Sequence, residues 1–243
     1  MSEATAPGFD PVLFDLDGTV VDTVELIVSS FRYATRTVLG RVLPDEFILA
    51  GVGRPLRAQM ERLSAEHAQE LYDVYREYNH RRHDELIRGY EGIDEVLGEL
   101  RAAGRRLGIV TSKSHDTTQM AFRALGLAGH FDVVVTATDT VEHKPSPVPL
   151  LLCLERLGAS AARAIYVGDS PFDIEAGAAA GTTTAAVAWG VFGREALLEA
   201  APDFWLDEPR ELLALCLRGE GRRAEAAAAP GAGPRPPAGL PEV

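Results

Sequence analysis

The sequence predicts an α/β fold built on a mostly parallel, Rossmann-like sheet, with a helical subdomain inserted after the first strand. Two observations lead to this prediction. From about residue 92 onward, apolar runs of strand length alternate with segments of helical periodicity, as expected for a sheet covered by helices on both faces. From Pro44 to about Gly89, in contrast, we identify no convincing strand, which indicates an inserted helical unit.

The first strand is predicted within the apolar stretch Val12–Val20, where two carboxylates occur. Side chains two residues apart on a strand point the same way, so Asp15 and Asp17 are expected to face one small volume. Open α/β sheets place their chemistry at the carboxyl ends of their strands, which is where these residues fall. Because Asp-Gly after a strand is also common in ordinary turns, this stretch alone favours a functional role only weakly.

Three helices are predicted in the inserted segment. A helix commonly begins at a polar capping residue or just before a proline, and it commonly ends at glycine. The first helix is predicted to begin at Asp22 or Thr23 and to end at Gly40. A short second helix is predicted to begin at Pro44, and a long charged third helix at Ser64.

The rest of the chain supplies the remaining strands and helices. The strands are predicted at residues 107–110, 131–136, 164–167 and 183–187, with a shorter one near 204–206. The helices between them are predicted to end at Gly104, Gly126, Gly158 and Gly181, and a last helix passes through Leu212 and Leu217.

Domain boundaries follow from these patterns. Residues 11–21 and 90–218 are assigned to the core domain, and residues 22–89 to the helical subdomain. Residues 1–10 are predicted to be a mobile tail. Residues 219–243 are rich in Arg, Glu, Ala, Gly and Pro, with almost nothing to bury, and are predicted to be disordered.

Composition restricts the environment and the partners. No apolar run approaches the roughly 18 residues of a membrane span, and Met1–Asp10 lacks the basic and apolar regions of a signal peptide. Cys153 and Cys216 lie in helical apolar patterns and are predicted to be buried thiols, which fits the reducing cytoplasm. The formal net charge of −12 argues against nucleic acid and anionic lipid as partners. An anionic substrate would therefore need locally placed cations.

Lysine is rare in this chain. Of its 24 basic residues, only Lys113 and Lys144 are lysines. Since the chain otherwise uses arginine, a retained lysine suggests a position that needs a compact point charge. With only two lysines, chance is the alternative explanation.

Polar residues follow four of the predicted strands. They are Asp15 with Asp17, Thr111, Lys144, and Asp169 with Asp173. Each has an ordinary explanation: Asp173 as a helix cap, Thr111 as a turn former, Lys144 as a surface charge and Asp169 as a loop residue. Their shared position at the carboxyl ends of strands nevertheless favours an active site. Four carboxylates together need a cation, and hard oxygen ligands point to Mg²⁺. A carboxylate neutralised by a metal can attack phosphorus, with a hydroxyl and a lysine supporting the transferring group. We find no zinc-type His pair at the site, no G-x-S-x-G elbow and no Walker loop.

These residues resemble the four motifs of the haloacid dehalogenase (HAD) superfamily, in that family's order and spacing. The matching stretches are Asp15-x-Asp17-Gly18-Thr19, Thr111, Lys144-Pro145 and Gly168-Asp169-x-x-x-Asp173. The resemblance implies the HAD core with a type-one helical cap that closes over small substrates and excludes water. The second aspartate favours phosphatases over the dehalogenase branch.

The resemblance also implies a role for each residue. Asp15 is the expected nucleophile, which forms an aspartyl-phosphate, and Asp17 protonates the leaving group and later activates water. Thr111 and the Ser112 backbone are expected to hold the phosphoryl group, and Lys144 to offset charge. Further residues expected near the phosphate are Gly18, Thr19 and Lys113, although Lys113 could point outward.

The expected Mg²⁺ ligands also come from the resemblance. They are Asp15, Asp169 and the main-chain carbonyl of Asp17. Asp173 is expected to orient this shell rather than to ligate directly.

Additional stretches resemble the bacterial HAD-type inorganic pyrophosphatases, to which phosphoglycolate phosphatases are near relatives. They are Thr23-x-Glu25-Leu26-Ile27, Asn79-His80-x-x-His83-Asp84, Lys144-Pro145-x-Pro147-x-Pro149, Gly193-Arg194-Glu195 and Pro202-Asp203-Phe204. The resemblance spans roughly residues 10–217 and implies hydrolysis of pyrophosphate. Phosphoglycolate or another small phosphomonoester is the alternative substrate. A sugar-phosphate mutase is less favoured, as is a non-catalytic binding protein, which would be expected to lose Asp15, Asp17 or Lys144.

Three residues of the helical segment are candidates for substrate contacts. Arg54 stands where an arginine is not expected in every pyrophosphatase of this type, so it could clamp a second anionic group or be an ordinary arginine. His80 and His83 lie three apart on a predicted helix and share a face. A partly protonated imidazole would suit a diphosphate, whereas beside Arg81 and Arg82 the pair could equally form a solvated face.

Overall fold

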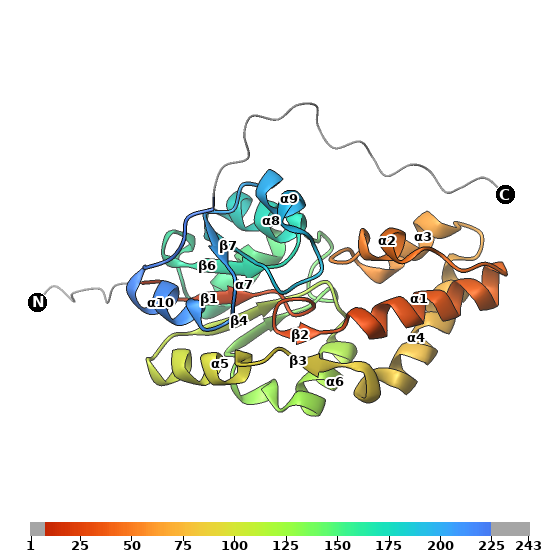
Figure 1. The fold of residues 1–243 in the computed structure, drawn as a ribbon, viewed down its shortest axis with the longest axis horizontal. Helices are drawn as coiled ribbons and strands as arrows, with labels where there is room; N and C mark the ends of the chain where they lie inside the picture. The colour runs from red at the N-terminus through yellow and green to blue at the C-terminus, as the bar shows by residue number, and fades with distance from the viewer. Residues whose placement is uncertain (1–7, 225–243) are drawn as a thin grey trace, which may run out of the picture.

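A parallel sheet forms the centre of the molecule, and a separate layer of helices lies beside it (Figure 1). A computed structural model describes residues 8–224 of the chain. The strands of the main sheet are β1 (Val12–Phe14), β4 (Leu107–Val110), β5 (Val133–Val135), β6 (Ile165–Gly168), β7 (Thr183–Val187) and β8 (Phe204–Leu206). They are arranged in the order β5-β4-β1-β6-β7-β8, and each neighbouring pair is parallel. The predicted α/β fold is confirmed.

Helices cover both faces of this sheet. They are α5 (Ile93–Ala102), α6 (His115–Leu125), α7 (Val148–Leu157), α8 (Pro171–Ala180), α9 (Arg194–Glu199) and α10 (Glu211–Arg218), with 3₁₀ turns at Leu127–Gly129 and Ala161–Arg163. In β1, Val12 and Phe14 pack in one cluster with residues of α5, α6 and α10, whereas Leu13 packs in another with α7 and α8. Because both faces are buried, the strands are continuously apolar rather than alternating.

The inserted helices have a hydrophobic cluster of their own. They are α1 (Val24–Leu39), α2 (Asp45–Leu49), α3 (Leu56–Leu63) and α4 (Ala68–Leu86), and we call them the helical cap. The Phe31 ring of α1 meets the Tyr75 ring of α4 edge to face, with centroids 4.9 Å apart. The chain enters and leaves the cap through an antiparallel ribbon of β2 (Val21–Asp22) and β3 (Arg88–Gly89). The assignment of residues 22–89 to a separate domain remains a prediction.

The cap contains one helix more than predicted. Ser64 does not cap the long helix, because it follows α3 in an extended conformation and its hydroxyl accepts a hydrogen bond from the His67 N–H. Helix α4 therefore begins at Ala68. The two-residue strands β2 and β3 and the short helix α9 were also not predicted, since such short elements carry no periodic pattern.

The ordered chain extends beyond both predicted tail boundaries. Asp10, placed in the mobile N-terminal tail, forms an ion pair with Arg106 at 2.8 Å. Near the other end, the Arg222 carbonyl accepts a hydrogen bond from Trp205 N–H, and Arg223 forms a bridge with Phe204. Residues at both predicted tail boundaries therefore pair with the core, and the assignment of the two tails stays a prediction. Residues 1–7 and 225–243 lie outside the described part of the chain.

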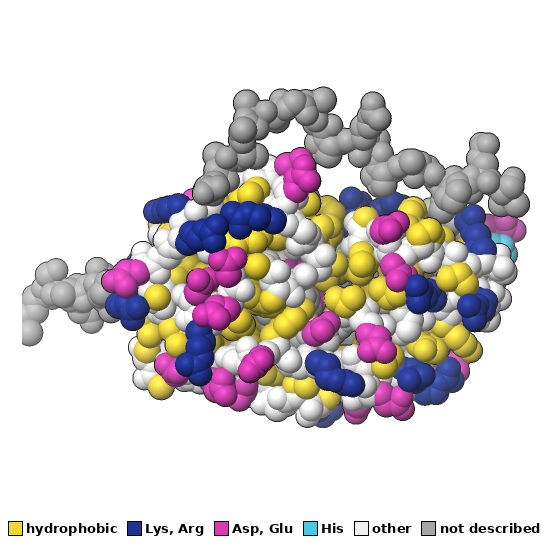
Figure 2. All heavy atoms as spheres, in the orientation of Figure 1, with side chains coloured by type: hydrophobic (Ala, Val, Ile, Leu, Met, Phe, Trp, Pro, Cys, Tyr) yellow, Lys and Arg dark blue, Asp and Glu magenta, His cyan; other side chains and the backbone are white. Residues whose placement is uncertain are grey.

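The charged surface, the two thiols and the lengths of the helices bear on the predicted environment of the protein. On the face shown in Figure 2, acidic and basic side chains are interspersed rather than gathered in one patch. Cys153 and Cys216 are free and buried as predicted, and burial raises the pKa of each thiol to about 12. Within residues 8–224, no helix combines the length and apolarity needed to cross a membrane.

Candidate active site

The carboxyl ends of three adjacent strands bring the predicted residues together. Asp15 follows β1, Thr111 follows β4 and Asp169 follows β6, and β1 lies between the other two strands. Parallel strands end at one edge of the sheet, so the three side chains converge there, and all three are buried. Lys144 and Asp173 reach the same place from the loop before α7 and from the first turn of α8.

Lys144 is buried in this cluster and surrounded by acceptors. Its Nζ lies 2.9 Å from Asp15 Oδ1 and 2.6 Å from Asp173 Oδ1. It also donates hydrogen bonds to the Tyr166 hydroxyl at 3.0 Å and the Val110 carbonyl at 3.3 Å. Burial alone would lower the pKa of Lys144, but the two carboxylates outweigh burial and raise that pKa above its ordinary value. Lys144 is therefore a buried ammonium and not a surface charge.

The buried carboxylates carry more negative charge than Lys144 can offset. Burial raises the pKa of Asp15 to about 7, with Lys144 opposing this effect and Asp173 and Asp17 adding to it. Burial, followed by Asp173 and Asp15, raises the pKa of Asp169 well above its ordinary value. Asp15, Asp169 and Asp173 each present an oxygen within 4.8 Å of the others, so this cluster could hold a metal ion. Hard, buried carboxylate oxygens fit a hard divalent cation.

Two glycines make room for Asp169. A Cβ on Gly18 or Gly190 would collide with the Asp169 side chain, and Gly18 also has a positive φ of +79°. Asp169 accepts hydrogen bonds from the Thr19 hydroxyl at 3.3 Å and the Val191 N–H at 2.8 Å. Gly18 and Thr19 thus support a carboxylate of the cluster, and their contact with phosphate stays a prediction.

Asp173 is a helix cap, which was its ordinary explanation, and it also contacts Lys144. It forms a reciprocal capping box with Ser170 at the start of α8, in which the Ser170 N–H donates to Asp173 Oδ2 at 3.0 Å. Its other oxygen pairs with Lys144 and accepts a hydrogen bond from Tyr166 at 3.0 Å. Helix capping therefore fixes the carboxylate that holds Lys144 in place.

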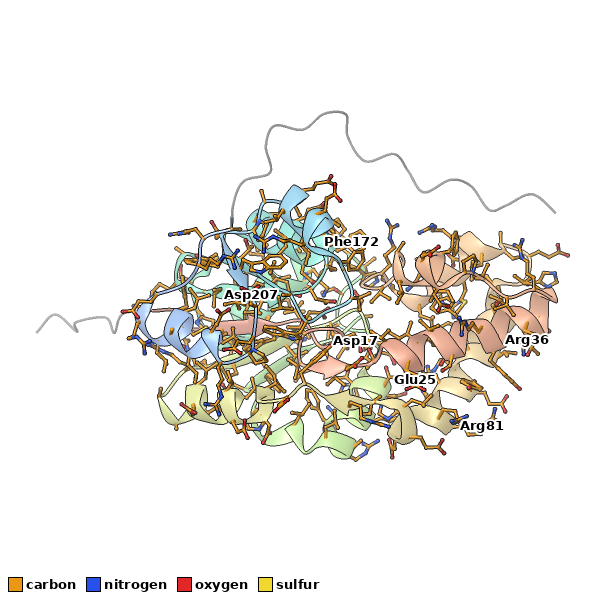
Figure 3. The ribbon with its side chains drawn as sticks, in the orientation of Figure 1. Asp17, Glu25, Arg36, Arg81, Phe172 and Asp207 are labelled. Atoms are coloured by element: carbon orange, nitrogen blue, oxygen red, sulfur yellow. The ribbon has the colours of Figure 1, made fainter. Side chains whose placement is uncertain are left out.

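The Asp17 side chain lies outside the carboxylate cluster, where β1 approaches the helical cap (Figure 3). Lys113 Nζ lies 2.7 Å from both of its oxygens, and Oδ1 also accepts a hydrogen bond from the Thr23 hydroxyl at 2.7 Å. Lys113 therefore faces the site and does not point outward. A metal contact through the Asp17 carbonyl stays a prediction.

A cavity of about 100 Å³ lies between this edge of the sheet and the helical cap. The core lines it with Asp15, Asp17, Thr111, Ser112 and Lys113, and the cap lines it with polar residues that include Arg54, Gln59, Tyr72, Arg76 and Asn79. The Ser112 hydroxyl donates a 2.7 Å hydrogen bond to the carbonyl of Gly53, which joins the two sides. The cavity thus has carboxylates and the hydroxyl groups of Thr111 and Ser112 on one side and guanidinium groups on the other.

The candidates in the cap differ in position. Arg54 lines the cavity, and its guanidinium carbon lies 4.7 Å from the centre of the Phe172 ring on α8. Burial, and then the neighbouring charge of Arg62, lowers the pKa of Arg54 below its ordinary value. Arg54 is an exposed residue at the cavity, so both alternatives, a clamp for a second anionic group and an ordinary arginine, stay open.

His80 and His83 are not among the residues that line the cavity. Burial, followed by Arg76 and His83, lowers the pKa of His80 below its ordinary value, which disfavours the partly protonated imidazole of the first alternative. His83 is fully buried, with Nδ1 2.7 Å from Asp84 Oδ1, so it does not belong to a solvated face. Direct contact of either histidine with substrate has no support in this arrangement.

Three residues of the site were not found from the sequence. Tyr166 follows the apolar pattern of β6, so nothing in the sequence shows that its hydroxyl contacts Lys144 and Asp173. Arg76 is one of many arginines, and only the cap packing brings it to the cavity. Thr23 was considered as a helix cap, but its hydroxyl binds Asp17.

The comparisons with known proteins agree with this site. The family model described as haloacid dehalogenase-like hydrolase matches residues 12–187. The chain belongs to this family, and it is an enzyme of the phosphatase and pyrophosphatase group.

Two relatives and two solved structures illustrate the similarity. A Bacillus velezensis protein named pyrophosphatase PpaX is 42% identical over 202 residues, which cover 83% of this chain and 94% of the relative. The Bacillus pumilus protein of the same name is 40% identical over 215 residues, covering 88% and 98%. A predicted phosphoglycolate phosphatase from Haemophilus somnus superposes with a TM-score of 0.80 at 23% identity, covering 85% and 97%. A haloacid dehalogenase-like family protein from Streptococcus pneumoniae has a TM-score of 0.76 at 28% identity, also covering 85% and 97%.

Proposed function

We propose that this protein is a cytoplasmic, Mg²⁺-dependent phosphohydrolase that forms an aspartyl-phosphate at Asp15 and prefers inorganic pyrophosphate. The observation that carries the proposal is the cavity, which has buried Asp15 on its core side and the guanidinium groups of Arg54 and Arg76 on its cap side. A substrate with two adjacent anionic groups would match both sides. The names of the relatives at 40–42% identity support pyrophosphate. Phosphoglycolate remains the alternative, since its carboxylate is also a second anionic group.

The chemistry requires two steps at one phosphorus atom. In the first, a carboxylate oxygen of Asp15 attacks phosphorus, the bond to the bridging oxygen breaks, and inorganic phosphate leaves with the bridging electron pair and a proton from Asp17. In the second, water attacks the phosphorus while Asp17 accepts a proton from that water, and Asp15 is released as carboxylate. Thr111 and the Ser112 N–H would hold the phosphoryl oxygens, and Lys144 would offset their charge.

Asp15 and Asp169, with the main-chain carbonyl of Asp17, would hold Mg²⁺, and Asp173, whose oxygens contact Lys144 and Ser170, would orient this shell. When bound, the ion would supply positive charge against the clustered carboxylates and the phosphoryl oxygens. Without such a cation, the raised pKa values of Asp15 and Asp169 show that the ionised cluster is unfavourable.

The function is tested by comparing kcat/KM for pyrophosphate with kcat/KM for phosphoglycolate in the presence of Mg²⁺. We expect a ratio of about 100 or more, which corresponds to about 2.7 kcal/mol of transition-state discrimination. A ratio well below one would identify a phosphoglycolate phosphatase instead. Conversion of a sugar 1-phosphate to its 6-phosphate without phosphate release would identify a mutase.

Mg²⁺ is also expected to stabilise the fold. Both raised aspartate pKa values mean that the metal-free folded state binds protons more tightly than the unfolded state, so its stability falls as pH rises from about 4 through 7. Saturating Mg²⁺, at about 100 times its dissociation constant, should add about 2.7 kcal/mol, or roughly 5–10 °C in Tm. The increase should be larger at pH 8 than at pH 6. Thermal melts of wild type and Asp169→Asn, at matched ionic strength, check this; an equal shift in both would contradict the assigned site.

A further inference from the structure

Three cations line the cavity: an aspartate neutralises the charge of Lys113, whereas Arg54 and Arg76 each lie over an aromatic ring. Lys113 Nζ contacts both carboxylate oxygens of Asp17 at 2.7 Å. The guanidinium of Arg54 forms a cation–π contact with the Phe172 ring, which connects the loop between α2 and α3 to α8 of the core. The remaining cation is Arg76 of α4, whose side chain is only 27% exposed.

Neutral groups hold Arg76 in position. Its Nη1 donates a hydrogen bond to the Tyr72 hydroxyl at 3.3 Å, and its Nη2 lies 3.2 Å from His80 Nε2. Because burial and the charge of Arg76 both lower the pKa of His80, this imidazole is neutral near pH 7 and can accept the hydrogen bond. These contacts orient the guanidinium without cancelling its charge.

The carboxylate nearest to Arg76 is held loosely. Asp116, in the first turn of α6, places Oδ2 3.9 Å from Arg76 Nη2, and its side chain is 76% exposed. An exposed ion pair at this separation contributes little to stability, so a better anion can replace it. This ion pair also connects the cap to the core, since α4 belongs to the cap and α6 belongs to the core.

We infer that Arg76 is the specificity-determining residue that binds the second anionic group of the substrate, and that Asp116 is the counter-ion which this group displaces. The inference rests on the proposed function, since it places the leaving phosphate of pyrophosphate against Arg76 while Asp15 attacks the other phosphorus. A guanidinium offers paired N–H donors that match two oxygens of a phosphate. The exposed carboxylate of Asp116, 3.9 Å away, does not form this paired contact.

The test compares pyrophosphate with p-nitrophenyl phosphate, whose leaving group carries no second phosphate. In Arg76→Met, the ratio of kcat/KM for pyrophosphate to that for p-nitrophenyl phosphate should fall about 100-fold. Arg76→Lys should recover part of this loss, because it keeps the charge without the paired donors. Asp116→Asn should lower KM for pyrophosphate about twofold to threefold, because the competing carboxylate is removed.

Arg81→Met is the matched control. Arg81 lies on the same helix, points to the outside (Figure 3), and pairs with Glu77 at 3.3 Å. Its replacement should leave the substrate ratio unchanged. The melting temperature and the activity on p-nitrophenyl phosphate show whether each variant is folded.

The outcomes separate this inference from the proposed function. If wild type hydrolyses pyrophosphate and Arg76→Met keeps the wild-type ratio of kcat/KM values, the inference is wrong. If that ratio falls in Arg54→Met instead, Arg54 is the residue that binds the second anionic group. If wild type prefers phosphoglycolate and Arg76→Met loses that preference, the preferred substrate is wrong but the second-anion site stands. If wild type acts only on p-nitrophenyl phosphate, both are overturned.

Discussion

Replacing Asp15 by asparagine is expected to lower kcat for pyrophosphate by about 10,000-fold or more, because the amide cannot act as the nucleophile. The fold should survive the change. Asn is close in size to Asp and uncharged, and the burial that raises the pKa of Asp15 to about 7 makes a neutral group acceptable at this position. The Tm of the metal-free variant should therefore equal or exceed that of wild type.

The measurement is steady-state phosphate release, with Asp94→Asn as the control. Asp94 lies on α5, its side chain is 72% exposed, and it contacts His130 away from the cavity. The control should keep wild-type kcat. Full activity in Asp15→Asn would exclude the aspartyl-phosphate mechanism, whatever the substrate.

Replacing Lys144 by methionine is expected to cost about 3–5 kcal/mol of unfolding free energy, because it leaves two buried carboxylates without their cation. Asp15 and Asp173 both lie within 2.9 Å of Lys144 Nζ, and all three side chains are at most 4% exposed. The pKa of Asp15 should rise further in the variant, so the loss should be larger at pH 8 than at pH 6. Phosphate release should also be largely lost.

Urea unfolding of Lys144→Met and Lys113→Met gives the comparison. Lys113 is the other lysine of the chain, and its ion pair with Asp17 is partly exposed, so its loss should cost much less. A double variant, Lys144→Met with Asp173→Asn, should regain part of the stability lost in Lys144→Met. Equal costs for the two lysine variants would contradict the role of Lys144 as a buried counter-ion.

Much of the fold could be predicted because its signals are local. The strands at residues 107–110, 183–187 and 204–206 have the predicted bounds, since each is a short apolar run between turn or helix signals. Gly40 and Gly126 take left-handed backbone at the ends of α1 and α6, as their positions indicated. The ribbon of β2 and β3 was missed because its two halves pair across the whole cap and neither has a pattern of its own.

The core of the site could be predicted for a different reason. Asp15, Thr111 and Asp169 each directly follow a strand, and a parallel sheet brings such positions to one edge, whereas Lys144 arrives there from the longer loop after β5. The cap side could not be predicted, because the contacts of Arg76, His80 and His83 depend on how α4 packs against α1 and α6. Helical spacing gave His80 and His83 a common face but did not show that His83 is buried.

The order of strands has a consequence for synthesis of the chain. Strand β1 carries the nucleophile and leaves the ribosome first, yet both of its neighbours in the sheet come much later, since Val12 pairs with Leu107 and Ile165. The cap helices pack mainly on one another and can fold while β1 still lacks a partner. Nascent chains that stop before Asp173 would therefore lack a complete catalytic centre. The proposed site also needs Val191, whose N–H binds Asp169, so it can be completed only late in translation.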